Sequence, residues 1–136
     1  MNALQDSVIF AKGELAAGEH FSGNVWLKRL IPAESPWNCP LGNVTFEPGA
    51  RNSWHRHPGG QVLLVTGGKG WYQEEGRTAQ SLCPGDVVMI PAHVKHWHGA
   101  QQNSWFTHLY IVANPSLGPC EWLEPVSDAQ YNALAK

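Results

Sequence analysis

The chain has 136 residues, of which 43% are hydrophobic and 15% are charged, and its formal net charge is −2. This length suits a single domain, and such a composition argues against intrinsic disorder. Lys and Arg are not clustered as nucleic-acid binding requires, no apolar run approaches the about twenty residues of a membrane helix, and the N-terminus does not resemble a secretory signal. We therefore expect a cytoplasmic protein that binds neither nucleic acid nor membrane.

Gly and Pro divide the sequence into short segments rich in Val, Ile, Leu, Trp and Tyr, a pattern typical of an all-β sandwich or barrel. Residues 1–40 are expected to form an irregular arm with an edge strand near Val25–Leu30. The barrel should occupy residues 41–115, with strands at Asn43–Glu47, Asn52–His57, Gln61–Thr66, Gly70–Glu75, Ala79–Leu82, Val87–Ile90, Lys95–Gly99 and Phe106–Val112. In the tail, residues 116–136, Ser127 and Gln130 can form a capping box for a short helix that runs to about Leu134.

Four side chains from separate strands suggest a metal site. His55 and His57 are two residues apart in an expected strand, so both lie on one face while Arg56 points away. Two imidazoles at this spacing can share an ion, although a structural pair of histidines on a barrel face is the alternative. Gln61 opens the next strand, and His96 begins a later one. Together they would leave positions open for water or substrate.

The spacing of these residues resembles the two motifs of the cupin family. The first is matched by Gly49-(five residues)-His55-x-His57-(three)-Gln61-(six)-Gly68, and the second by Gly85-(five)-Pro91-(four)-His96. This resemblance implies a single cupin domain, a double-stranded β-helix or jelly-roll barrel, that holds one divalent transition-metal ion through His55, His57, Gln61 and His96.

The chain departs from the usual family pattern at Gln61, at His93 and at Ala100, where the family usually has Asn. The family usually has Glu at the place of Gln61, and a neutral amide ligand should strengthen the Lewis acidity of the ion. The alternative is that Gln61 only donates a hydrogen bond to a ligand. His93 stands where the family usually has Gly, so we expect an unusual turn geometry there.

Further segments resemble the small bacterial cupins that act as hydroxynitrile lyases, and the cupins found near or fused to carboxymuconolactone decarboxylases. These segments are Val44–Arg51, Trp54-His55, His96–Gly99 and Thr107–Leu109. The resemblance implies manganese as the metal, with iron, nickel, zinc or cobalt as alternatives. It also implies His98, which shares strand parity with His96, as a candidate base. In these relatives a small hydroxyl residue often stands at the place of Asn52.

His108 is a second candidate base, because it could point into the same cavity from its strand. The alternatives are that His98 is a hydrogen-bond partner of a ligand and that His108 is a satisfied core histidine. Trp54 and Trp97 alternate with the ligands and should pack on the opposite side. Arg51 either orients an anionic group or forms a surface ion pair. An apolar mouth could be lined by Phe46, Val44, Leu109 or Ile111.

The three cysteines are widely spaced and form no CxxC pair, so they are expected to be ordinary reduced residues rather than thiolate ligands of zinc: Cys39, Cys83 and Cys120.

The favoured function is a metal-dependent lyase that cleaves or forms a carbon–carbon bond in small cyanohydrin-like substrates. The alternatives are a metal-dependent dioxygenase or isomerase of aromatic degradation, and a non-catalytic module that binds a metal or a small ligand. Because cupin barrels commonly pair through edge strands and arms, we also expect a homodimer or homotetramer.

Overall fold

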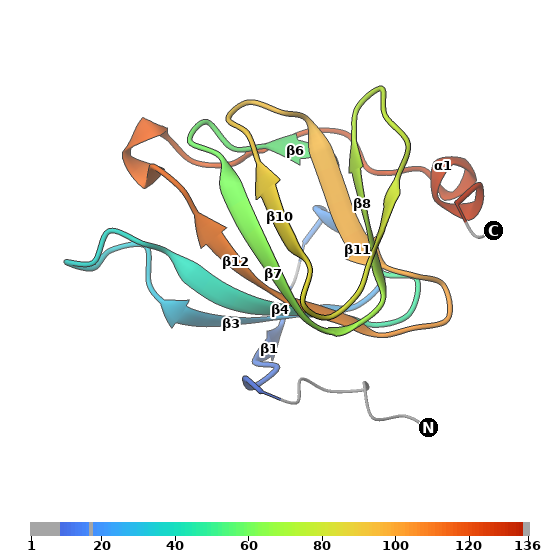
Figure 1. Ribbon diagram of the computed structural model, residues 1–136, viewed down its shortest axis with the longest axis horizontal. Coiled ribbons are helices and arrows are strands. Elements are labelled where there is room, and N and C mark those ends of the chain that lie inside the picture. The colour runs from blue at the N-terminus through green and yellow to red at the C-terminus, as the bar shows by residue number, and fades with distance from the viewer. Residues whose placement is uncertain (1–8, 17, 135–136) are drawn as a thin grey trace.

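Two antiparallel β-sheets curl around a shared interior to form a jelly-roll barrel, as expected from the sequence (Figure 1). The computed structural model describes residues 9–16 and 18–134, so residues 1–8 of the expected arm lie outside the described residues. Within the described residues, no helix has the length and apolar character that crossing a membrane requires.

The first sheet has six strands in the order β1 (Glu14–Leu15), β3 (Val25–Ile31), β4 (Leu41–Phe46), β12 (Phe106–Val112), β7 (Gln61–Gly68) and β10 (Val87–Ile90). The second contains β13 (Glu121–Trp122), β6 (His55–Arg56), β11 (His96–Ala100), β5 (Arg51–Asn52) and β2 (Phe21–Ser22) in that order. It is extended by β8 (Gly70–Glu74), which pairs with β11, and by β9 (Gln80–Leu82), which pairs with β8. The strand near Val25–Leu30 therefore has neighbours on both sides, β1 and β4.

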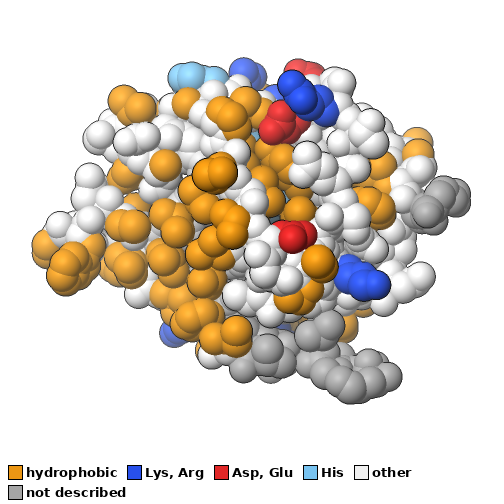
Figure 2. Space-filling view, viewed as in Figure 1, with side chains coloured by type: hydrophobic (Ala, Val, Ile, Leu, Met, Phe, Trp, Pro, Cys, Tyr) orange, Lys and Arg blue, Asp and Glu red, His pale blue; other side chains and the backbone are white. Residues whose placement is uncertain are grey.

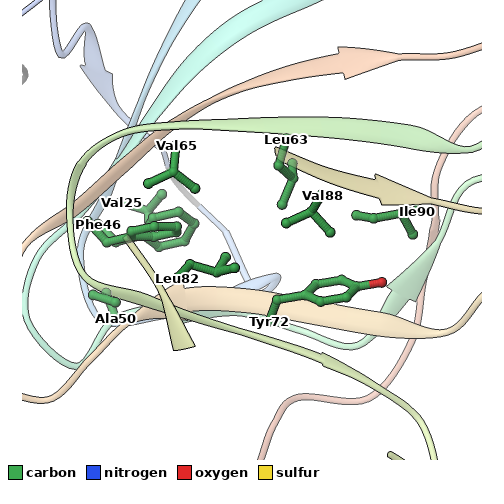
Figure 3. Close-up of a cluster of buried hydrophobic side chains, with 11 residues drawn as sticks. Val25, Phe46, Ala50, Leu63, Val65, Tyr72, Leu82, Val88 and Ile90 are labelled. Atoms are coloured by element: carbon green, nitrogen blue, oxygen red, sulfur yellow. The ribbon is translucent and has the colours of Figure 1, made fainter. Parts of the chain in front are cut away.

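The hydrophobic core fills one end of the space between the sheets. Along β7 the odd-numbered residues Leu63 and Val65 are buried, while Val62 and Leu64 are partly exposed, as strand alternation requires. Figure 3 shows Val65 and Leu63 facing Phe46, Leu82 and Tyr72 across the interior. At the other end polar side chains replace this apolar filling.

The strand expected at Asn52–His57 is interrupted, which corrects the sequence prediction. Between β5 and β6, the Ser53 N–H donates to the His20 carbonyl, and Trp54 exchanges backbone hydrogen bonds with Leu123 and Glu124. These two residues thus pair with flanking segments of the chain instead of β11. His55 still resumes pairing with β11, opposite His96.

A short helix, α1 (Asp128–Asn132), follows the barrel, with the expected capping box between Ser127 and Gln130. It ends two residues before the expected Leu134. A 3₁₀ turn, Pro115–Leu117, precedes β13.

Arg51 is nearly buried on β5 and holds the α1 segment rather than facing the interior. Its guanidinium donates to the Val126 carbonyl at 2.9 Å, pairs with Asp128 at 2.8 Å, and lies 4.4 Å from the Tyr131 ring centroid. Of the two roles open for Arg51, the structure shows the ion pair.

Candidate metal centre

The residues expected to bind metal come together at the polar end of the barrel. His55 on β6 and His96 on β11 are opposite each other in register, and their ring centroids are 4.2 Å apart. His57 lies just beyond β6, with its ring 5.2 Å from that of His55 and 6.0 Å from that of His96. Gln61, the first residue of β7, lines the same cavity as His55 and His57.

Backbone carbonyl groups orient two of these rings. His55 Nδ1–H donates to the Ser53 carbonyl oxygen at 2.8 Å, and His96 Nδ1–H donates to the Val94 carbonyl oxygen at 2.9 Å. A carbonyl oxygen only accepts, so each ring must carry its proton on Nδ1 and present Nε2 as a free lone pair. Such hydrogen bonds orient metal-binding histidines in many proteins.

Two buried polar atoms at this site have no partner within the described part of the chain: His96 Nε2 and the Gln61 side-chain oxygen. Leaving a buried acceptor unsatisfied costs free energy, so such atoms call for an explanation. Imidazole nitrogens together with an amide oxygen suit divalent transition metals. The residues present therefore fit a metal ion.

The nitrogen and sulfur donors fall into two overlapping groups that share His55. In one group His55, His96 and His98 have donor atoms that all lie within 4.8 Å of one another, and in the other His55, His57 and Cys120 do. The sequence reasoning missed Cys120, because no spacing motif connects it to the histidines. Only the pairing of β13 with β6 brings this thiol to the site.

Burial keeps these side chains neutral near pH 7. It lowers the pKa values of His57 and His96 from 6.5 to about 4, and lowers that of His55 well below 6.5 with help from the neighbouring His96. Burial raises the pKa of the Cys120 thiol to about 12, so without a cation the thiol keeps its proton. Neutral imidazoles are the form that binds metal.

His98 and His108 form a buried pair beside the metal ligands. His108 Nδ1 lies 3.2 Å from the Leu109 carbonyl oxygen and must donate to it, so His108 Nε2 accepts from His98 Nδ1–H at 3.1 Å. The Asn52 side-chain oxygen accepts the His98 backbone N–H at 2.9 Å, which turns its amide nitrogen towards the His98 ring at 3.3 Å. Of the two ring nitrogens of His98, Nε2 is therefore the unprotonated one.

The described cavity beside the histidines has a volume of about 300 Å³. Its walls are mostly apolar and include Val44, as expected. Tyr110 and Val112 line it in place of Leu109 and Ile111, which corrects the sequence prediction. Once His108 faces inward, alternation along β12 turns those two residues outward. Phe46 belongs to the core cluster instead.

Two further expectations are confirmed by the structure. His93 has a φ of 66°, in the left-handed region, and its N–H donates to the His57 carbonyl at 3.0 Å, which fixes the loop that carries His57. Trp54 and Trp97 pack with Val126 and Tyr131 in a cluster outside the cavity.

Comparisons with known proteins agree with this geometry. A family described as "Cupin domain" matches residues 42–112, more than half of the chain. The (R)-mandelonitrile lyase of Granulicella tundricola is 45% identical over 111 residues, which cover 82% of this chain and 85% of that protein.

Solved structures give the same picture. A cupin-like protein from Thermotoga maritima superposes with a TM-score of 0.91 and 46% identity over 94% of this chain and 97% of that one. A cupin-2 domain from Rhodospirillum rubrum, at 20% identity, shares the fold with a TM-score of 0.72 over 90% of each chain. The motifs, the two-sheet barrel and these matches together establish that the chain belongs to the cupin family.

Proposed function

We propose that this cupin is a metal-dependent lyase that cleaves small hydroxynitriles into a carbonyl compound and hydrogen cyanide, or forms them in the reverse direction. The observation that carries the proposal is the buried pair His98–His108, in which the His98 ring lies among the metal-binding groups. The similarity to a protein named (R)-mandelonitrile lyase supports the same chemistry.

In this proposal one divalent cation, which we expect to be manganese, is held by His55, His57, Gln61 and His96. When bound, the cation supplies a Lewis acid for the oxygen of the substrate. One ring nitrogen of His98 lies within 4.8 Å of ring nitrogens of His55 and His96, which places the His98 ring beside the site of the cation.

The acid–base work belongs to His98. Its Nε2 takes the hydroxyl proton of the hydroxynitrile while the carbon–cyanide bond breaks, and the electron pair of that bond leaves with cyanide. The oxygen and carbon then share a double bond, and the proton returns from His98 to cyanide. Burial lowers the pKa of His98 well below 6.5, so the ring is an unprotonated base at neutral pH.

His108 and Asn52 prepare His98 for this step. His108 Nε2 accepts the Nδ1 proton of His98, so a positive charge that develops on His98 is shared through a 3.1 Å hydrogen bond. The Asn52 amide fixes the ring plane. The apolar walls, among them Val44 and Val112, exclude water from the cyanide ion as it leaves.

Release of benzaldehyde and cyanide from mandelonitrile tests the proposal. Protein loaded with manganese should catalyse release, chelated protein should not, and His98→Ala should lose most of the activity. Oxygen uptake by iron-loaded protein with a catechol would indicate the dioxygenase chemistry instead. If neither cleavage nor synthesis of mandelonitrile depends on metal, the lyase proposal is wrong.

A further inference from the structure

An unpaired cation lies in the wall of the mostly apolar cavity. Among the described residues that line the cavity, Arg29 alone carries a permanent charge. Within residues 9–16 and 18–134, its guanidinium has no ion-pair partner within 4.0 Å. Glu14 lines the same outer groove as Arg29 and still forms no such pair. Arg29 is therefore available to a ligand.

The position of Arg29 follows from the register of the first sheet. Arg29 on β3 is paired with Gly42 on β4, and Gly42 is paired with Tyr110 on β12. A Cβ atom at Gly42 would lie only 2.7 Å from the Tyr110 hydroxyl and 2.5 Å from Cε2 of its ring. The phenol thus packs directly against Gly42, next to the strand that carries Arg29.

The Tyr110 hydroxyl is the second free polar group at this point. It forms no side-chain hydrogen bond with any residue in the described part of the chain. Burial raises the pKa of Tyr110, whereas the nearby Arg29 charge lowers it, with burial the larger effect. The hydroxyl consequently keeps its proton and can donate it to an anion beside the guanidinium.

Arg29 is carried three strands away from the proposed metal ligand Gln61, whereas Tyr110 lies on β12, the strand next to that of Gln61. The order β3–β4–β12–β7 separates the strands of Arg29 and Gln61 by three spacings, about 14 Å at about 4.8 Å each. Both side chains extend into the shared cavity and shorten the gap. The remaining space, within a volume of about 300 Å³, suits a substituted benzene ring or a short aliphatic chain.

We propose that Arg29 and the Tyr110 hydroxyl form a carboxylate-binding subsite, so that the preferred ligand carries a carboxylate at the end remote from the metal centre. The planar guanidinium matches a carboxylate, and the hydroxyl supplies one more donor. The identity of this ligand as a carboxylated hydroxynitrile, or the matching aldehyde, rests on the proposed function. The existence of the carboxylate-binding subsite does not depend on that function.

Calorimetric titration of the full chain with two inert probes tests the subsite. The probes are 4-acetylbenzoate and 4-methylacetophenone, which differ by a carboxylate in place of a methyl group. We expect the carboxylate to bind about tenfold more tightly, in metal-free and metal-loaded protein alike. Arg29→Gln should remove this preference, and Tyr110→Phe should reduce it about threefold.

Lys28→Gln is the matched control, because it removes the same charge from the neighbouring, exposed position on β3. It should keep the preference. Equal affinities in the wild-type protein, a preference that survives Arg29→Gln, or one that exists only with metal bound would each overturn the subsite. A preserved preference without mandelonitrile cleavage would support the subsite while contradicting the lyase proposal.

Discussion

His98 Nδ1 lies 3.1 Å from His108 Nε2, and both rings are buried. Because His108 must use its other nitrogen to donate to the Leu109 carbonyl, the direction of the hydrogen bond between the rings is fixed. His98 thus carries its proton on Nδ1, and its Nε2, which the Asn52 amide also approaches, is an acceptor rather than a donor. A base, and not an acid, is the role that this arrangement prepares.

The first prediction separates a base from a metal ligand at His98. His98→Ala should lower kcat for mandelonitrile cleavage by about 10²- to 10⁴-fold and keep close to one metal ion per chain. His57→Ala should lose the metal as well as the activity. Elemental analysis of both purified variants is the measurement. Loss of metal from His98→Ala would instead make His98 a ligand, in line with its group with His55 and His96.

The second prediction concerns the neutral ligand. Gln61→Glu keeps the side-chain length and places a negative charge where the unpartnered amide oxygen lies. We expect metal affinity to rise about tenfold or more and kcat to fall, because the added charge weakens the cation as a Lewis acid. Competition with a chromophoric chelator measures the affinity. Unchanged affinity would show that Gln61 does not touch the ion.

The third prediction is acid sensitivity of the metal-free protein. Burial lowers the pKa of His96 from 6.5 to about 4. Between pH 6.5 and pH 4, His96 is therefore protonated in the unfolded chain but neutral in the folded one. Stability should be complete above pH 6.5 and fall progressively towards pH 4, by about 2 kcal/mol at pH 5 from His96 alone.

Urea unfolding at pH 7.5 and pH 5 measures this effect. The pKa of His108 is also lowered to about 4 by burial, so His108→Gln should unfold with a weaker dependence on pH than the wild-type protein. Equal or greater stability at pH 5 would contradict the assignment of neutral, buried rings.

The fourth prediction tests how the α1 segment is held. Arg51→Met removes the hydrogen bonds to the Val126 carbonyl and to Asp128, and should lower the free energy of unfolding by about 2 kcal/mol. Arg77→Met, which removes an exposed ion pair with Glu74, serves as the control and should change stability by less than about 0.5 kcal/mol. Chemical denaturation of both variants measures the change in the free energy of unfolding. Similar decreases for Arg51→Met and Arg77→Met would contradict the role of Arg51.

The fifth prediction is self-association. Along β10, one of the two edge strands of the first sheet, Val87 and Met89 are 56% and 77% exposed. Figure 2 shows hydrophobic side chains gathered over much of one side of the molecule. We expect a homodimer or homotetramer by light scattering, and Met89→Lys should shift it towards the monomer. A wild-type monomer at high concentration would contradict this expectation.

Local sequence was sufficient to predict the barrel and the histidines that face its interior. The two-residue spacing of His55 and His57, and of His96 and His98, places each pair on one strand face in any β-structure. The interruption at Ser53 was not predictable, because its cause is a backbone partner at His20, thirty-three residues earlier in the chain.

The same limit explains the two features of the site that sequence reasoning missed. Cys120 reaches the histidines through the β13–β6 pairing, and Arg29 meets Tyr110 across Gly42. Neither contact leaves a periodic signal, because each depends on register between segments that are distant in the sequence. By contrast, the error at Leu109 could have been avoided, since an inward His108 already excluded it.

The stacked pair His20–Trp122, with ring centroids 4.4 Å apart, joins the turn between β1 and β2 to β13, the last strand. Trp122 also lies beside His55, at 4.8 Å. The rim of the cavity is thus supplied by stretches that contribute few residues to the core, while the histidines are carried by the barrel itself. Substitutions in these flanking stretches can therefore change which ligands enter the cavity, while the strands that position the reactive groups stay the same.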